Sequence, residues 1–212
     1  MRYHPKSVGS QLASKLLGTY EKEINKFTEK IIQRRPERII NVGAAEGYYA
    51  VGFAMRSLNS RVMAFEGQTE GRTLIQRNGE LNQVADRIDI QGYCDSEMFQ
   101  RALTSCAAPV VIMDVEGFEK ELLDPEKFPA LFRAIILVEV HVAEEIQMES
   151  ILEGRFRGSH NIEREPIRSF APTDIAPALL KKISFLPAAI ILKAIDEQRS
   201  DKGSWFFMRP KG

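Results

Sequence analysis

The clearest indication of the fold is the segment Ile39-Ile40-Asn41-Val42-Gly43-Ala44-Ala45-Glu46-Gly47-Tyr48-Tyr49-Ala50. An apolar run of strand length comes first, two glycines four residues apart follow, and a helical pattern begins at Tyr48. This order is typical of a buried strand that runs through a tight loop into a helix. Glycine has no Cβ and tolerates positive φ, so the loop lets backbone amides approach a ligand closely.

The spacing of the glycines restricts the ligand. A dinucleotide-binding loop reads G-x-G-x-x-G to admit a pyrophosphate, whereas this loop reads G-x-x-x-G and has Ala45 where the second glycine belongs. A Walker-type phosphate loop is excluded because no Gly-Lys-Ser or Gly-Lys-Thr follows. The pattern therefore argues against NAD.

Short apolar runs alternate with helical stretches on the carboxyl side of this loop, which indicates βαβ units and a mostly parallel sheet. We predict seven strands: Arg38–Val42, Arg61–Phe65, Ile88–Gln91, Val110–Asp114, Ala134–Val140, Asn161–Glu165 and Trp205–Arg209. We predict helices between the first five: Tyr48–Leu58, Thr69–Leu81, Ser96–Thr104 and Phe118–Leu131, the last interrupted by Pro125 and Pro129. The fold class is therefore three-layer, Rossmann-like α/β.

Two further segments carry helical patterns. Apolar residues at spacings of three and four from Leu12 to Ile31 predict one amino-terminal helix that ends before Pro36 and packs ahead of the sheet. The apolar stretch Phe185–Ile195 is interpreted as a core helix, with a substrate-covering lid or a partner surface as the alternative.

Composition bounds the class of protein. The 212 residues include 29 Lys and Arg and 29 Asp and Glu, so the charge excess that a nucleic-acid duplex binder needs is missing. Cys94 and Cys106 are too few for a disulfide framework, and no apolar run reaches the ~18 residues of a membrane span. We expect one cytoplasmic domain, residues 1–212, with a helical extension over 1–36, a core over 37–212 and no membrane partner.

Carboxylates follow successive predicted strands. Glu66 lies roughly 20 residues beyond the glycine loop, where such folds present an acid to the two hydroxyls of a ribose. Asp95 follows the third strand and either accepts from an adenine amine or caps the helix that begins at Ser96. Asp114 ends the fourth strand, so we expect it at the ligand crevice.

The fifth strand adds Glu139 and His141 at its carboxyl end. If the fourth and fifth strands are neighbours, these two residues and Asp114 converge on the substrate side of the crevice. Two uses follow from that arrangement. Either His141 is a general base, or the three residues hold a divalent cation that acidifies a hydroxyl group.

Three blocks of this chain resemble the class I S-adenosylmethionine-dependent methyltransferases, and within them the FkbM-type family. They are Asn41-Val42-Gly43-Ala44-Ala45-Glu46-Gly47, the strand-end Glu66, and Asp114-Val115-Glu116-Gly117-Phe118-Glu119. The resemblance runs from Glu37 to about His141, extends weakly to the terminal strand at Trp205-Phe206-Phe207-Met208, and implies a methyltransferase fold with a reversed final strand. The family commonly has a lysine where this chain has Ile112.

The resemblance also implies roles for individual residues. Gly43 and Gly47 would shape the loop around the methionine end of the cofactor, Glu66 would bind the ribose and Asp95 would lie near the adenine. Asp114 would lie between cofactor and acceptor. The predicted cofactor-binding residues are Asn41, Gly43, Ala44, Glu46, Gly47, Tyr48, Glu66, Asp95 and Asp114, and the predicted catalytic residues are Asp114 and His141.

A hydroxyl of a small or sugar-like molecule is the expected acceptor. No Asn/Asp-Pro-Pro-aromatic signature and no Pro-Cys follow the fourth strand, which disfavours methylation of a nucleic-acid base. One alternative is an RNA or protein methyltransferase with a local basic face, for which Lys30, Arg34, Arg35 and Arg38 are the candidates. The other is a non-catalytic module that binds S-adenosylmethionine or S-adenosylhomocysteine.

Overall fold

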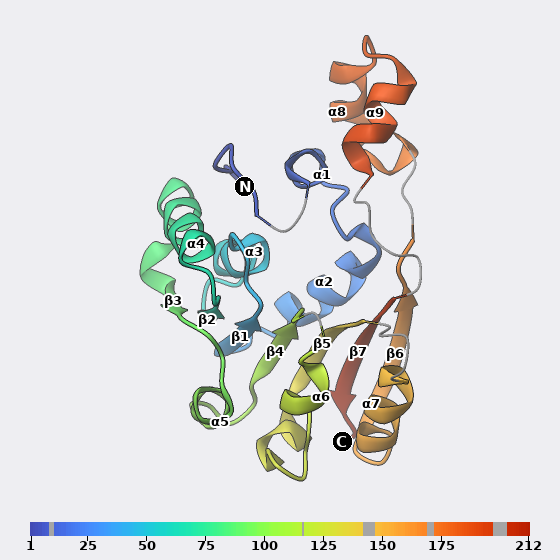
Figure 1. The fold of residues 1–212 in the computed structure, drawn as a ribbon. Coiled ribbons are helices and arrows are strands. Elements are labelled where there is room, and N and C mark those ends of the chain that lie inside the picture. Colours follow the sequence, from blue (N-terminus) through green and yellow to red (C-terminus); the bar gives the residue numbers. More distant parts are fainter. Residues whose placement is uncertain (9–10, 116, 142–146, 169–171, 197–202) are drawn as a thin grey trace.

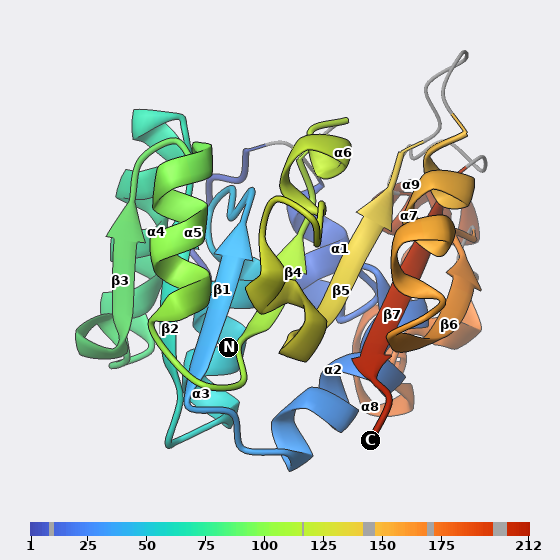
Figure 2. The ribbon, with the colours of Figure 1, turned by 90° about the horizontal axis from the view of Figure 1, so that it is seen from below.

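A computed structural model describes the chain except for residues 9–10, 116, 142–146, 169–171 and 197–202. Its centre is a seven-stranded sheet in the order β3-β2-β1-β4-β5-β7-β6, in which β7 runs antiparallel to both neighbours and the other pairs are parallel. The strands are β1 Arg38–Val42, β2 Arg61–Phe65, β3 Ile88–Gln91, β4 Val110–Met113, β5 Ile135–Val140, β6 His160–Pro166 and β7 Ser204–Pro210. In Figure 2 the arrowheads of β1, β3 and β5 point to one edge and that of β7 to the other.

Helices cover both faces of this sheet (Figure 1). The α-helices are α1 Leu12–Leu17, α2 Asn25–Gln33, α3 Tyr48–Arg56, α4 Thr69–Leu81, α5 Ser96–Thr104, α6 Glu119–Leu122, α7 Met148–Phe156, α8 Pro177–Ile183 and α9 Ala188–Ile195. One face is covered by α2, α3 and α4, and the other by α5, α6 and α7. The sheet is therefore the middle layer of three.

The strand sequences build two cores because successive side chains point to opposite faces. In β1, Ile39 packs in the core under α2 and α3, whereas Ile40 and Val42 pack in the core under α5 and α7. In β7, Trp205 and Phe207 take the first side and Phe206 and Met208 take the second. A strand buried on both faces reads as a continuous apolar run, which is the pattern that predicted these strands.

The predicted strands are confirmed to within one residue at each end, and the predicted helices over 69–81 and 96–104 are confirmed without change. The prediction of a single amino-terminal helix is wrong. Gly18 adopts φ 71° and closes α1, a 3-10 turn at Lys22–Ile24 follows, and α2 begins at Asn25. The apolar spacing continues across this break, so periodicity alone did not reveal the left-handed glycine that ends a helix.

The prediction for Phe118–Leu131 also needs correction, because only α6 and a 3-10 helix at Pro129–Arg133 form there. Proline lacks the N–H that a helix interior needs, and Pro125 and Pro129 divide the segment. The core-helix interpretation of Phe185–Ile195 is wrong over much of its length. Ile191 and Ile195 are buried, but Phe185 is 80% exposed.

We predict that Gly43→Ala lowers the free energy of unfolding by about 3 kcal/mol or more, because φ is 77° and an added Cβ would lie 1.8 Å from the carbonyl oxygen of Asp114. The matched control is Gly52→Ala in α3, where an added Cβ meets nothing within 4 Å. It should be neutral or stabilise by up to about 1 kcal/mol. Urea unfolding of both variants checks this, and equal midpoints for Gly43→Ala and the parent chain would contradict it.

Candidate active site

The carboxyl ends of β1, β2 and β4 meet at the glycine loop. The backbone amides of Gly43 and Ala44 both donate to the carbonyl of Phe65, at 3.1 and 2.9 Å. The amide of Asp114 donates to the carbonyl of Val42 at 3.1 Å. The loop is therefore held on two sides by its neighbouring strands before any ligand is considered.

Glu66 lies directly against this loop. One carboxylate oxygen accepts from the backbone amide of Ala45 at 2.8 Å, and the other accepts from the amide of Gln68 at 2.7 Å. A Cβ on Gly71 of α4 would lie 2.7 Å from the Cγ of Glu66, so this glycine permits the close packing. Each carboxylate oxygen can accept a further hydrogen bond, so the acid remains able to hold hydroxyl groups.

Asp114, Glu139 and His141 converge, as predicted, because β4 and β5 are neighbours in the sheet. One ligand atom from each lies within 4.8 Å of the others. The Nε2 atom of His141 is 3.5 Å from a carboxylate oxygen of Asp114 and 3.8 Å from one of Glu139. Glu116, in the same sequence block as Asp114, lies outside the described residues.

Glu119 completes this cluster and is a residue for which sequence reasoning assigned no role. Its carboxylate is fully buried, and one oxygen lies 2.7 Å from Nδ1 of His141. Burial lowers the pKa of His141, but the hydrogen bond to Glu119 and the charges of Glu139 and Asp114 outweigh it and raise that pKa to about 9. His141 therefore carries a proton at neutral pH when only protein groups surround it.

Four side chains at the edge of the site have distinct environments. Asp95 caps α5 by accepting from the amide of Met98 at 2.8 Å, so the capping alternative is confirmed. Asn41 is 2% exposed, and its Oδ1 has no hydrogen-bond partner among the described residues. Tyr93 and Phe118 are exposed and form an edge-to-face pair with ring centroids 6.1 Å apart.

Glu46 of the loop is covered by the amino-terminal segment. Its side chain has no exposed area, forms an ion pair with Lys15 whose side chain is 2% exposed, and accepts from Ser7 and from Tyr3. These donors come from far along the chain, where no local pattern links them to the loop. The carboxylate of Glu46 thus anchors residues 1–8 and 11–18 to the glycine loop.

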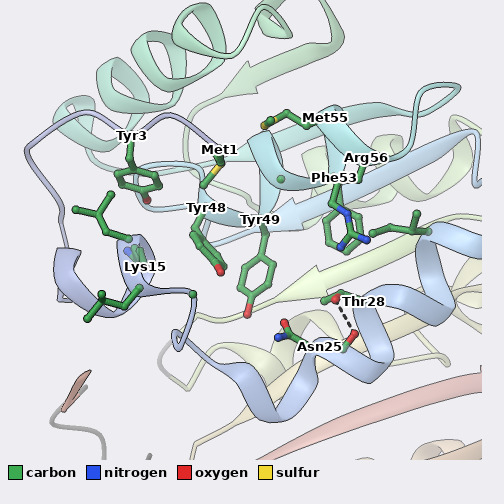
Figure 3. Close-up of a pocket in the computed structure, with 15 residues that line it drawn as sticks. Met1, Tyr3, Lys15, Asn25, Thr28, Tyr48, Tyr49, Phe53, Met55 and Arg56 are labelled. Atoms are coloured by element: carbon green, nitrogen blue, oxygen red, sulfur yellow. Dashed lines mark hydrogen bonds between the residues drawn. The ribbon is translucent and has the colours of Figure 1, made fainter. Parts of the chain in front are cut away.

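A cavity of about 400 Å³ lies beside this anchor, between α1, α2 and α3 (Figure 3). Tyr48 and Tyr49 project into it from α3, with Lys15 on one side and Phe53 and Arg56 on the other. Tyr48 packs edge-to-face on Tyr20, with the two ring centroids 4.9 Å apart. Neither Asp114 nor His141 lines this cavity.

No known family profile matches the chain, and no curated protein matches it in sequence. Solved structures do match. The O-methyltransferase TomG from Streptomyces achromogenes, involved in tomaymycin synthesis and crystallised with S-adenosylmethionine, aligns with a TM-score of 0.56 at 15% identity over 94% of this chain and 79% of that one.

Two further structures extend this likeness. A domain designated precorrin-6Y C5,15-methyltransferase from Corynebacterium diphtheriae has a TM-score of 0.53 at 16% identity, over 92% of this chain and 99% of that one. A protein designated an rRNA methylase from Clostridium thermocellum has a TM-score of 0.54 at 12% identity, over 88% and 95%. The chain therefore has the Rossmann-like fold of class I S-adenosylmethionine-dependent methyltransferases.

We predict that Lys15→Met costs about 3–5 kcal/mol of unfolding free energy, because it leaves Glu46 buried without its cation. The double variant Lys15→Met/Glu46→Gln should recover most of that loss. Lys6→Met is the matched control, since Lys6 pairs with Glu70 at the surface and the pair contributes about 1 kcal/mol or less. A urea-unfolding cycle in which Lys15→Met costs no more than Lys6→Met would refute the anchor.

Proposed function

We propose that this protein is an S-adenosylmethionine-dependent methyltransferase of the FkbM type that methylates a hydroxyl group of a small, sugar-like molecule. The observation that carries the proposal is the backbone contact between Gly43 and Asp114. It joins a loop suited to the cofactor directly to a cluster of carboxylates and one imidazole suited to an acceptor. The fold it shares with TomG supports the reaction class.

The residues around the glycine loop fit this cofactor. Glu66 has lone pairs left for two ribose hydroxyls after accepting from Ala45 and Gln68. Asn41 has a buried acceptor atom without a donor, which the ammonium of the methionine part would supply. Tyr93 lies 3.8 Å from where a Cβ on Gly67 would be, next to Glu66, and offers an aromatic face to an adenine.

Bound S-adenosylmethionine supplies an activated methyl group, so the protein has to align the acceptor, exclude water and remove a proton. We call Asp114, Glu119, Glu139 and His141 the acid cluster. Within it, Asp114 is the residue whose backbone closely approaches Gly43 of the glycine loop. We assign it the junction between cofactor and acceptor. Asp95, the cap of α5, is assigned a second contact at the adenine.

The groups around His141 favour a bound divalent cation over a role for His141 as the general base. An imidazole that already carries a proton at neutral pH cannot take one from a hydroxyl. Asp114, Glu119 and Glu139 bring three carboxyl groups to one imidazole. This surplus of carboxyl groups suits a divalent cation, which would take the place of the proton on Nε2 of His141 and would lower the pKa of an acceptor hydroxyl bound beside it.

Glu119 is the positioning residue of this arrangement. When Nδ1 of His141 carries a hydrogen that it donates to Glu119, Nε2 is left with a lone pair toward Asp114 and Glu139. A carboxylate behind the distal nitrogen is the usual partner of a metal-binding histidine, since it fixes ring orientation and tautomer. Asp114, Glu139 and His141 would then be the protein ligands.

A small-molecule acceptor is favoured over RNA because part of the basic cluster in the amino-terminal extension is already paired with an acid. Lys30 forms an ion pair with Glu163 of β6 at 2.7 Å, and Arg209 reaches the same carboxylate. That part of the cluster is thus used within the fold. Phosphate contacts require cations that are free to neutralise a backbone.

We predict that calorimetry detects S-adenosylhomocysteine binding and that Glu66→Ala weakens it roughly 10- to 100-fold through the loss of two hydrogen bonds. Glu80→Ala, at an exposed position of α4, should leave the affinity unchanged. Glu66→Gln keeps an acceptor oxygen for Ala45 and should give an intermediate affinity. If the folded parent chain does not bind S-adenosylhomocysteine, the cofactor assignment is wrong.

We predict that electron paramagnetic resonance shows Mn²⁺ binding to the chain. Asp114→Asn and His141→Ala should each weaken it at least about tenfold, and Glu119→Gln should weaken it about 10- to 100-fold through ring orientation. Glu80→Gln is the control. Equal Mn²⁺ affinity in the parent chain and Asp114→Asn, or turnover that persists after chelation, would eliminate the cation.

A further inference from the structure

The helical hairpin of α8 and α9 stands clear of the sheet beyond α1 (Figure 1). Its inner side has a small core of its own, in which Ile175, Ile191 and Ile195 are buried and Leu17 of α1 packs against them. On its outer side, the described residues leave large apolar side chains of the hairpin uncovered. Phe185 is 80% exposed, Ile190 52% and Leu192 45%.

Basic residues accompany these exposed apolar side chains. Residues 177–195 contain Lys181, Lys182 and Lys193 and no aspartate or glutamate, and all three lysines are exposed. None of them forms an ion pair with a residue of the described chain. At 100° per residue, Lys193 lies on the face of α9 opposite Ile191 and Ile195, with Ile190 and Leu192 on either side of it.

We propose that the outer side of the α8–α9 hairpin docks on the surface of an anionic lipid bilayer. Large apolar side chains on short helices enter the boundary between headgroups and acyl chains, and flanking lysines extend their ammonium groups to lipid phosphates. Charge complementarity favours this occupant. A second copy of the chain would bring two sets of three lysines together, so its pairing is opposed by like charge.

The sequence expectation of no membrane partner rested on the lack of a spanning run. Among the described residues, no helix is long and apolar enough to cross a bilayer. That finding concerns spans, whereas docking needs only an amphipathic surface with apolar and basic residues together.

The hairpin also has a defined place relative to the candidate active site. Its two stems are joined where the amide of Ile167 donates to the carbonyl of Gly203 at 3.2 Å. Ser204 then pairs with Val140, the residue before His141. A docked hairpin therefore starts from the same edge of the sheet as the acid cluster.

Flotation with vesicles tests the proposal without any cofactor, so its outcome is independent of the proposed reaction. The parent chain should float with vesicles that contain phosphatidylglycerol, should not float with pure phosphatidylcholine, and should detach at about 1 M salt, where the Debye length is about 3 Å. Lys181→Gln/Lys182→Gln/Lys193→Gln should weaken binding on the order of a hundredfold. Phe185→Ser/Ile190→Ser/Leu192→Ser should weaken it at least about tenfold.

Two control variants and one spectroscopic readout accompany these measurements. Leu58→Ser removes a leucine that is 74% exposed elsewhere, and Lys211→Gln removes an exposed lysine beyond the end of β7; neither should change binding. The only tryptophan, Trp205, is fully buried, so F185W adds a second indole that reports on the hairpin alone. Its emission should shift to the blue with anionic vesicles.

Three results would overturn the proposal. The first is a folded parent chain, verified by circular dichroism, that does not bind anionic vesicles. The second is binding that the hairpin variants leave unchanged. The third is a dimer in sedimentation analysis that Phe185→Ser/Ile190→Ser/Leu192→Ser dissociates, since this would assign the surface to a second copy.

Discussion

The approach of two backbones at Gly43 and Asp114 is the constraint on which the site depends. An added Cβ at Gly43 would lie 1.8 Å from the carbonyl oxygen of Asp114, and the amide of Asp114 is bonded to Val42 at 3.1 Å. The loop after β1 and the end of β4 are therefore placed by main-chain atoms. Register then places the rest, because Met113 pairs with Val138 and brings Glu139 and His141 beside Asp114. Main-chain contacts and strand register therefore join the glycine loop to the cluster of Asp114, Glu119, Glu139 and His141.

Charge is distributed unevenly in a chain whose net charge is zero. Glu66, Asp114, Glu119 and Glu139 gather at one sheet edge, where His141 is the nearby cation. Two groups of lysines lie away from this edge: one is paired with acids at the amino-terminal extension, and the other is exposed on the α8–α9 hairpin. An acidic edge suits a cationic sulfonium and a metal ion, whereas a basic hairpin suits an anionic surface. The two proposed sites would thus select ligands of opposite charge.

The local pattern of apolar residues predicted most of the strands and helices, and the expected order of the parallel strands predicted part of the candidate site. Apolar runs located each strand because both faces of the sheet are covered, and neighbouring parallel strands made the convergence of Asp114 with His141 predictable. Long-range pairings were not predictable. Nothing near Glu119 in the sequence indicates that it bonds to a histidine 22 positions later, or that Lys15 is buried against Glu46. The exposure of Phe185 was not predictable for a related reason: an apolar sequence does not show which of its side chains will be buried against other elements.

A crystal structure with S-adenosylhomocysteine and Mn²⁺ would show directly whether the glycine loop and the acid cluster form one active site. We expect the ribose on Glu66, the amino-acid part along Gly43–Gly47, and the metal between Asp114, Glu139 and His141. A nucleoside bound instead in the aromatic cavity between α1, α2 and α3 would contradict this expectation. So would an empty glycine loop at saturating ligand.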